Sequence, residues 1–170
     1  MRARVQSFAP ILGKHPRILI LGSMPGIASL EAVQYYAHPR NVFWPIMADL
    51  FSIDAEADYA QRIAQISEVP VILWDTLKRC ERPGSLDASI KHDTVEANDI
   101  PGLLAEYPAI SAVACNGATS ANYFRRLVMP QISAGIEIDL LPMPSTSPAN
   151  AGMTFAQKLT AWRRLLDYID

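Results

Sequence analysis

Cysteine is nearly absent from this sequence. Only Cys80 and Cys115 occur, and they do not form a closely spaced pair. Two thiols cannot supply a four-thiolate iron–sulfur cluster or a structural zinc site. We therefore expect reduced thiols in or near the core, with no bound metal and no cofactor.

Charge and long apolar runs are also limited. Only 19% of the residues are charged and the formal net charge is −2. A polyanionic partner would therefore have to be bound by a local basic patch rather than by a global positive field. No window of about 18 apolar residues occurs, and Met1–Lys14 contains Arg2 and Arg4 without an apolar segment. Neither a membrane span nor a signal peptide is expected, and the default location is cytoplasmic.

Hydrophobic residues make up half of the 170 residues, which suits a single packed domain over residues 1–170. Four apolar runs predict β-strands: Arg17–Gly22, Pro70–Trp74, Ala109–Cys115 and Ile136–Leu141. The first three are nearly continuous, as in strands buried on both faces, and the fourth alternates at first, as in an edge strand.

Helical patterns lie between these runs. Ser29 is expected to cap a short helix that ends at Val33, and Asn41 to cap a second helix that contains Phe43 and Leu50. Further helices are predicted over 59–66, 119–127 and 154–169, the last with capping-box spacing between Thr154 and Gln157. Strands that alternate with helices predict a three-layer α/β/α fold around a central, mainly parallel four-stranded sheet.

Ligands of such sheets bind beyond the carboxyl ends of the strands. The segments that follow the four predicted strands are rich in small or polar residues, and we expect them to converge on one rim: Gly22–Gly26, Asp75–Arg79, Asn116–Thr119 and Pro142–Pro148.

Three segments combine chemistry with turn-forming residues. Gly22–Gly26 forms a tight turn whose backbone can approach a ligand closely. Tyr35–Trp44 contains phenols, an imidazole, a guanidinium and a carboxamide, and Pro144–Asn150 offers three hydroxyls suited to phosphate oxygens. Ordinary structural roles stay open on the residues alone, including a helix cap for Asn41 and a loop hydrogen bond for His38.

Taken together, these motifs resemble the uracil-DNA glycosylase superfamily. They read Gly22-Ser-Met-Pro-Gly26, Tyr36-Ala-His-Pro-Arg-Asn-Val-Phe-Trp44 and Met143-Pro-Ser-Thr-Ser-Pro-Ala-Asn150. The resemblance spans nearly the whole chain and is nearest to the hypoxanthine-DNA glycosylase branch (family 6). The His-Pro-x-Asn-x-Phe-Trp segment is also similar to mismatch-specific uracil-DNA glycosylases. The resemblance implies a monomeric, monofunctional enzyme of base excision repair that flips a deaminated base, hypoxanthine or uracil, out of DNA.

The resemblance also assigns roles at the base. Most branches place a water-activating Asp or Asn where Met24 stands here, whereas the hypoxanthine branch uses the asparagine that matches Asn41. His38 is a candidate donor to the departing base, and Tyr36 matches the aromatic residue that stacks on the base. Gly22, Ser23 and Met24 match the loop around the base, and Asn116 matches a base-reading position. Met143 stands where other branches place a histidine, so the donor to the leaving base stays unassigned.

Contacts with the DNA backbone follow from the same comparison. Ser145, Thr146 and Ser147 are expected to hold phosphates, and Arg40, Lys78 and Arg79, with Arg82 and the turn Gly84–Ser85 nearby, to lie on the active rim. Met153 and the turn 148–152 are candidates for the wedge that fills the gap in the duplex. Lys78, Lys91 and Lys158 are interpreted as surface residues, so no amine nucleophile is expected and hydrolysis should leave the strand uncut.

Two other functional classes remain open on the sequence. A flavodoxin-like nucleotide-binding protein or a small-molecule hydrolase would have the same strand-end organisation, although no Gly-x-Ser-x-Gly elbow or catalytic triad is evident. A non-catalytic domain that recognises damaged DNA would result if Asn41 were only a helix cap and Met24 marked a lost catalytic site.

Overall fold

A central sheet organises the chain, of which the computed structural model describes residues 4–169. Its strand order is β2-β4-β3-β7-β8, with bounds Ile11–Leu12 (β2), Ile18–Gly22 (β3), Val71–Asp75 (β4), Ala112–Asn116 (β7) and Asp139–Met143 (β8). The last four strands are parallel, and β2 pairs antiparallel with β4 at one edge. The predicted three-layer α/β/α fold is confirmed. The sheet has five strands rather than four, because β2 is too short to produce a periodic pattern.

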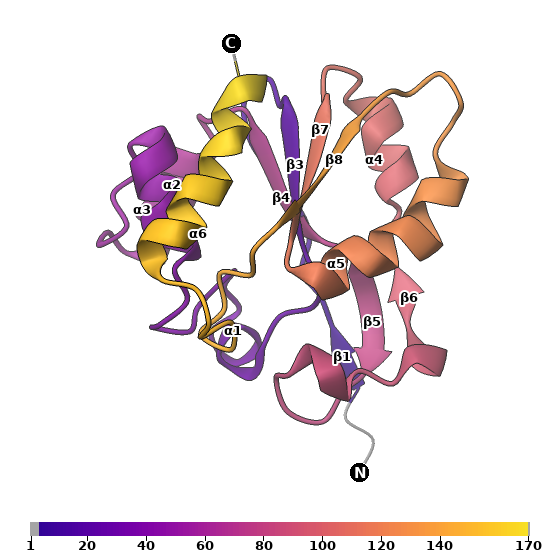
Figure 1. The fold of residues 1–170 in the computed structure, drawn as a ribbon, viewed down its shortest axis with the longest axis horizontal. Coiled ribbons are helices and arrows are strands. Elements are labelled where there is room, and N and C mark those ends of the chain that lie inside the picture. The colour runs from indigo at the N-terminus through magenta and orange to yellow at the C-terminus, as the bar shows by residue number, and fades with distance from the viewer. Residues whose placement is uncertain (1–3, 170) are drawn as a thin grey trace.

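Alternate side chains of the buried strands feed two cores. Ile18 and Ile20 of β3 pack on one face, under α2 (Phe43–Phe51), α3 (Tyr59–Ile66) and α6 (Phe155–Trp162). Leu19 and Leu21 pack on the other face, under α4 (Ile100–Glu106) and α5 (Ala118–Tyr123). Figure 1 shows these helices on the two sides of the sheet. Both Cys80 and Cys115 are buried and free, as expected.

A second, antiparallel sheet was not expected from the sequence. It is formed by β1 (Arg4–Gln6), β5 (Leu77–Glu81) and β6 (Glu96–Ala97), in the order β1-β5-β6. The segment Asp75–Arg79, which follows the second predicted strand, therefore contains the start of β5 at Leu77. Leu77 and Cys80 of β5 point into a third apolar cluster with Met24, and burial of these side chains favours a strand.

Helix boundaries agree in part with the predictions. Helix α3 has the predicted bounds, and Thr154 and Gln157 form the predicted capping box of α6, which continues as a 3-10 segment over Arg163–Tyr168. Helix α5 continues as a π segment over Phe124–Val128. Short 3-10 turns occur at Asp87–Ser89, His92–Thr94 and Met129–Gln131.

The predicted cap at Ser29 is wrong. Helix α1 spans Ile27–Ala32 with Gly26 at its N-cap, so Ser29 lies inside the helix. Its buried hydroxyl instead accepts the Ala37 N–H at 3.1 Å, which ties α1 to the following loop. Within residues 4–169, no helix is long and apolar enough to cross a membrane.

Candidate functional site

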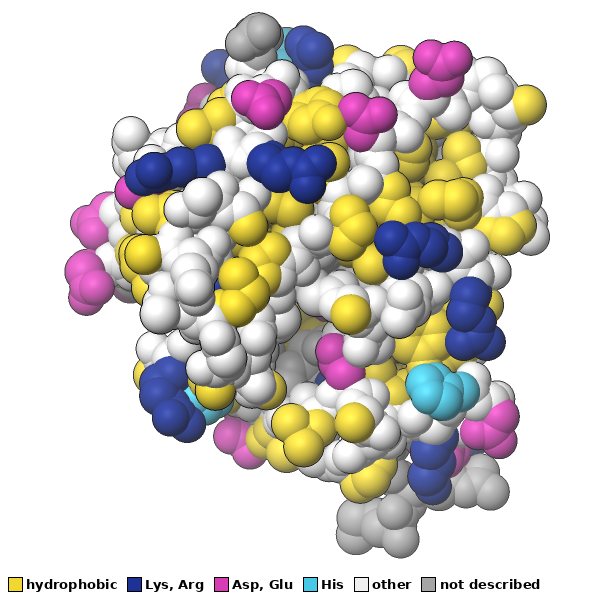
Figure 2. Space-filling view, viewed as in Figure 1, with side chains coloured by type: hydrophobic (Ala, Val, Ile, Leu, Met, Phe, Trp, Pro, Cys, Tyr) yellow, Lys and Arg dark blue, Asp and Glu magenta, His cyan; other side chains and the backbone are white. Residues whose placement is uncertain are grey.

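A cleft of about 690 Å³ lies at the carboxyl ends of the parallel strands. Its walls contain residues from four predicted segments: 22–26, 35–41, 116–119 and 145–150. The loop 85–88 completes the rim, and Figure 2 shows this face of the molecule hollowed. Another cavity, of about 680 Å³, is lined by residues such as Ser111, Glu137 and Tyr168 and contains none of the predicted site residues. The cleft is therefore the candidate site.

The Gly22–Gly26 turn is held against the loop 85–88, which begins in the predicted turn Gly84–Ser85. Ser23 Oγ donates to Asp87 Oδ1 at 2.7 Å, and the Ile27 N–H donates to Ser85 Oγ at 2.8 Å. Burial raises the pKa of Asp87, and the Ser23 hydrogen bond opposes that shift. Met24 turns most of its side chain into the third apolar cluster, although it still lines the cleft.

Arg82 joins two loops inside the protein. The expectation that it lies on the rim as a cation for DNA is therefore wrong. Its guanidinium donates to the Pro25 carbonyl oxygen at 2.7 Å and to the Gly84 carbonyl oxygen at 2.8 Å. Only 1% of the residue is exposed. A phosphate of bound DNA therefore has no access to this cation.

Tyr36 is held in an unusual conformation beside the cleft. Its backbone φ of 55° lies in the left-handed region, which a bulky residue adopts only when its surroundings enforce it. Its ring stacks on Phe43 at a centroid distance of 3.9 Å, and Trp44 Nε1 anchors the preceding carbonyl of Tyr35 at 2.9 Å. The ring is therefore fixed by two residues of α2.

His38 and Asn41 have defined hydrogen-bonding states. His38 Nδ1 accepts the Arg40 N–H at 3.1 Å, so in the neutral imidazole the proton is on Nε2. Asn41 Oδ1 accepts the Phe43 N–H at 3.0 Å, which fixes the orientation of the carboxamide. Asn41 thus contacts the start of α2 as expected, although the N-cap residue itself is Val42.

Asn116 and Thr146 are paired with each other. Asn116 Oδ1 accepts the Thr146 N–H at 2.9 Å, and its Nδ2 donates to Thr146 Oγ1 at 3.0 Å. Both residues are buried, with Thr146 only 1% exposed. The pair joins the end of β7 to the loop after β8, close to the Tyr36 hydroxyl. Asn116 lines the cleft, its base-reading role stays a prediction, and most of its hydrogen-bonding capacity is already used.

The loop 145–150 is stiffened by its own hydroxyls. Ser145 Oγ accepts the Ser147 N–H at 3.2 Å, and Ser147 Oγ accepts the Ala149 N–H at 3.1 Å. Each hydroxyl keeps its proton for an external acceptor. Lys158, expected at the surface, is instead buried beneath this loop, where Nζ donates to the Ser147 carbonyl oxygen at 3.3 Å. Burial lowers the pKa of Lys158.

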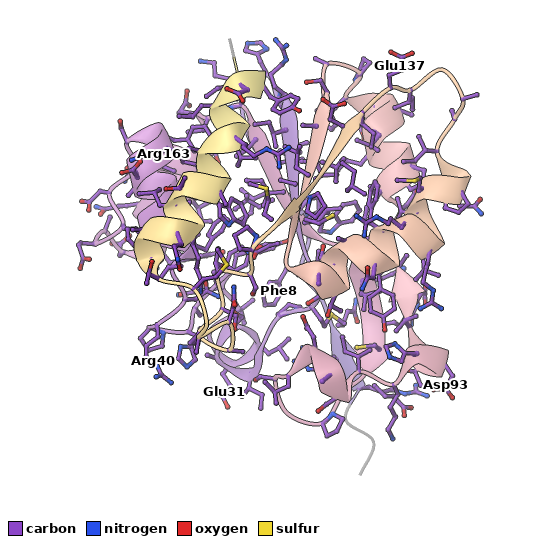
Figure 3. All side chains as sticks on the ribbon, in the orientation of Figure 1. Phe8, Glu31, Arg40, Asp93, Glu137 and Arg163 are labelled. Atoms are coloured by element: carbon purple, nitrogen blue, oxygen red, sulfur yellow. The ribbon has the colours of Figure 1, made fainter. Side chains whose placement is uncertain are left out.

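The predicted cations are not gathered in one place. Arg40 is exposed, lines the cleft and projects outward from the molecule (Figure 3). Lys78 and Arg79 lie on β5, outside the cleft wall, and both form ion pairs with Glu96. Of the three, only Arg40 combines exposure with a position at the cleft.

Two carboxyl groups and an aromatic ring that were not singled out as site residues also line the cleft, although the segment that begins at Asp75 was expected on the rim. Asp75 ends β4, Asp87 lies in the loop after β5, and Phe8 packs edge-on against Tyr35. The position of Asp75 at the end of an apolar run was the one signal in the sequence. Among residues 4–169, no three His, Cys, Asp or Glu side chains are grouped so that they could hold a metal ion.

Comparison with known proteins agrees with this arrangement. Residues 10–166 match the family model of the Uracil DNA glycosylase superfamily. A hypoxanthine DNA glycosylase of Methanosarcina barkeri is 34% identical over 119 residues, which cover 69% of this chain and 74% of the relative. A hypoxanthine DNA glycosylase of Methanosarcina acetivorans is 29% identical over 146 residues, covering 85% and 87%.

A solved structure extends the similarity to the fold. The solution NMR structure of a candidate uracil DNA glycosylase from Methanosarcina acetivorans superimposes with a TM-score of 0.77 at 26% identity. The similarity covers 96% of this chain and 99% of that one. The chain belongs to the uracil DNA glycosylase superfamily and is a DNA glycosylase of that family.

Proposed function

We propose that this chain excises hypoxanthine from deoxyinosine in DNA by hydrolysing the N-glycosidic bond. The observation that carries the proposal is the single cleft that unites Tyr36, Asn41 and the hydroxyl loop 145–147. Two curated relatives are named hypoxanthine DNA glycosylase, which favours this base. Uracil is the second candidate, favoured by the name of the matching family model.

Access to the base requires flipping, since the glycosidic bond of a stacked base cannot be reached inside a duplex. Tyr36 has one face on Phe43 and borders the cleft, so its other face is suited to receive the flipped base. Stacking of a base on an aromatic ring contributes roughly 1–3 kcal/mol. That gain offsets part of the cost of unstacking, which is lowest for mispaired bases.

Bond cleavage places opposite charges on the two fragments. As the bond from C1′ to the base breaks, its electron pair leaves with the base and the sugar becomes oxocarbenium-like. Asn41 holds the attacking water through the free lone pair of its oriented carbonyl oxygen. The water oxygen bonds to C1′ and its proton is lost to solvent, while the departing base is protonated in turn. Nε2–H of His38 is available as a donor at the rim.

Phosphates beside the flipped nucleotide are held by the hydroxyls of Ser145 and Ser147 and by Arg40. Both hydroxyls already accept a backbone N–H, so they donate outward. Thr146, which we expected to share this role, is buried and positions the loop through Asn116. Among residues 4–169, Arg40 is the one exposed Lys or Arg that lines the cleft, so DNA binding should depend only mildly on salt.

Leu86 is our candidate for the side chain that fills the gap in the duplex. It is a large apolar side chain, 58% exposed, on the rim of the cleft. Of the candidates from sequence, Met153 lies outside the cleft wall, whereas the first three residues of the turn 148–152 line it. Apolar side chains that enter a base step in this way partly unstack it. Leu86→Ala should weaken binding to lesion-containing duplex, and Leu166→Ala, an exposed leucine away from the cleft, is the matched control.

Strand cleavage is not expected from this chain. A Schiff-base lyase needs an amine nucleophile at the sugar, and within residues 4–169 no lysine lines the cleft. Lys158 is near the hydroxyl loop, but its amine is bonded to the Ser147 carbonyl oxygen.

The deciding experiment is excision from fluorescent oligonucleotides that carry one deoxyinosine or one deoxyuridine, with Asn41→Ala in parallel. We expect wild type to release hypoxanthine and leave an alkali-labile, uncut strand. Asn41→Ala should lose at least about 100-fold in rate while keeping DNA affinity. Release of uracil alone would change the assigned base, and lesion binding without release of either base would indicate a non-catalytic domain.

A further inference from the structure

Lys158 is a buried cation that the mechanism above does not use. It lies in the first turn of α6, which follows the loop 145–150 in the chain (Figure 1), and only 5% of the residue is exposed. Its Nζ donates to the Ser147 carbonyl oxygen at 3.3 Å, and the loop that it contacts lines the cleft. The fold therefore places a positive charge directly behind the proposed phosphate-binding hydroxyls.

The charge of Lys158 is not balanced by a carboxylate. Within residues 4–169, the ion pairs all involve other lysines and arginines. Burial lowers the pKa of Lys158. The side chain of a helical residue also points back toward the helix N-terminus, where the helix dipole carries partial positive charge. A buried charge without a counter-ion costs free energy, and an anion bound nearby would offset that cost.

The main-chain carbonyl oxygens of residues 144–147 each accept a hydrogen bond from the protein. Such oxygens carry partial negative charge and would repel a phosphate if they were left free. Lys158 binds the last of the four. The other three donors, in chain order of their acceptors, are the Trp162 indole N–H at 2.9 Å, the Asn150 amide at 3.2 Å and the Val42 N–H at 3.1 Å. Lys158 thus completes a set of contacts that suits the loop to an anion.

We propose that Lys158 is a positioning residue for DNA: its buried charge attracts the phosphate that Ser145 and Ser147 bind, and its contact with the Ser147 carbonyl oxygen fixes the loop for that phosphate. The inference rests on the proposed function, in which this loop holds a phosphate beside the flipped nucleotide. A buried ammonium group suits this role, because salt screens it less than an exposed one and its position is set before DNA binds. It adds to Arg40 in a chain whose formal net charge is −2.

The test compares Lys158→Met and Lys158→Arg with the unsubstituted lysine, all in the Asn41→Ala background, which leaves the base attached. Fluorescence anisotropy at one salt concentration measures affinity for a deoxyinosine duplex and for the matched undamaged duplex. Methionine has nearly the length of lysine without its charge, so Lys158→Met should bind the deoxyinosine duplex about tenfold more weakly. The loss should be smaller on undamaged DNA, whose nucleotide is not drawn into the cleft. Lys158→Arg keeps the charge and should keep most of the affinity.

Thermal melting separates this role from a purely structural one. Because Lys158→Met removes an unpaired buried charge, its melting temperature should be unchanged or higher while its affinity falls. A lysine that only supported the fold would lower both quantities together when replaced. Lys14→Met is the matched control, since it removes the same charge from an exposed lysine that pairs with Glu68 near the amino end of β4. It should leave the affinity unchanged.

Two outcomes would overturn the proposal. The first is unchanged affinity for the deoxyinosine duplex in a folded Lys158→Met variant. The second is a joint loss of stability and affinity that Lys158→Arg does not restore, which would show that the lysine only supports the fold. Absence of base release by wild type would instead overturn the proposed function, while the measured affinities would still decide the role of Lys158 in binding DNA.

Discussion

The two sides of the cleft differ in whether their polar groups have hydrogen-bond partners within the protein. On the β8 side, Asn116 and Thr146 satisfy each other, and the serines of the following loop accept neighbouring N–H groups. On the β4 side, Asp75 keeps a buried oxygen without a partner. A network whose hydrogen bonds are made within the protein keeps a loop in one conformation, whereas a buried polar group without a partner can still bond to a ligand. The difference separates the Asn116–Thr146 pair, which builds the site, from the Asp75 carboxyl group, which is open to a ligand.

The largest expected effect is on the free energy of unfolding, which burial of the Asp75 carboxyl group makes dependent on pH. Because its folded pKa of about 7 exceeds the value of 3.8 for an unperturbed carboxyl, the folded state retains a proton that the unfolded state loses between these limits. Wild-type stability should therefore fall, relative to Asp75→Asn, by about 1.4 kcal/mol per pH unit over this window and level off above pH 7. Urea unfolding of both proteins at pH 4 to 8 measures the difference. If the free energies of unfolding of the two proteins changed with pH in parallel, the pKa of Asp75 would not be raised in the folded state.

The next effect is on the β8 side of the cleft, where Asn116 and Thr146 are paired. Asn116→Ala leaves the buried N–H of Thr146 without an acceptor and should destabilise the fold by about 1–3 kcal/mol. Asn150→Ala removes only a partly buried bond to the Ser145 carbonyl oxygen and should cost less than about 1 kcal/mol. Thermal melts of the two variants compare their stabilities directly. Equal losses of stability would contradict the claim that the Asn116–Thr146 pair contributes more to the fold than the Asn150 bond.

Tyr36 is fixed by stacking on Phe43 and also lines the cleft in which the base is proposed to bind. Tyr36→Leu should weaken binding of a deoxyinosine duplex by roughly 1–3 kcal/mol through loss of stacking. Tyr36→Phe keeps the ring and should stay near wild type in affinity. Fluorescence anisotropy with matched undamaged DNA measures both, and a Tyr36→Leu variant with unchanged lesion affinity would rule out stacking.

The smallest expected effect is at the rim. Arg40→Ala should reduce the slope of log affinity against log salt by about one, with only a small loss of affinity at moderate salt. Arg163→Ala removes an exposed arginine that pairs with Asp49 outside the cleft, and it should leave the slope unchanged. A salt titration of DNA binding settles the comparison.

The sequence predicted the parts of this molecule that repeat a local pattern. Buried runs such as 18–22 predicted β3, and the motif residues 36–41 were placed at the correct end of the sheet. Strands β2 and β6 have only two residues each, too few for any periodicity. The state of Asp75 could not be predicted either, since it depends on Asp87 and Gly22, which are distant in sequence and adjacent only in the fold.

The close approach of Gly22 to Asp75 has an evolutionary consequence. A methyl group at position 22 and a carboxyl at position 75 would occupy the same space, because a Cβ there would be 2.4 Å from Oδ1. An alanine at position 22 therefore requires the Asp75 carboxyl group to move or to be replaced by a smaller side chain. A laboratory lineage that starts from this chain should therefore reach the double mutant more readily when position 75 is replaced first.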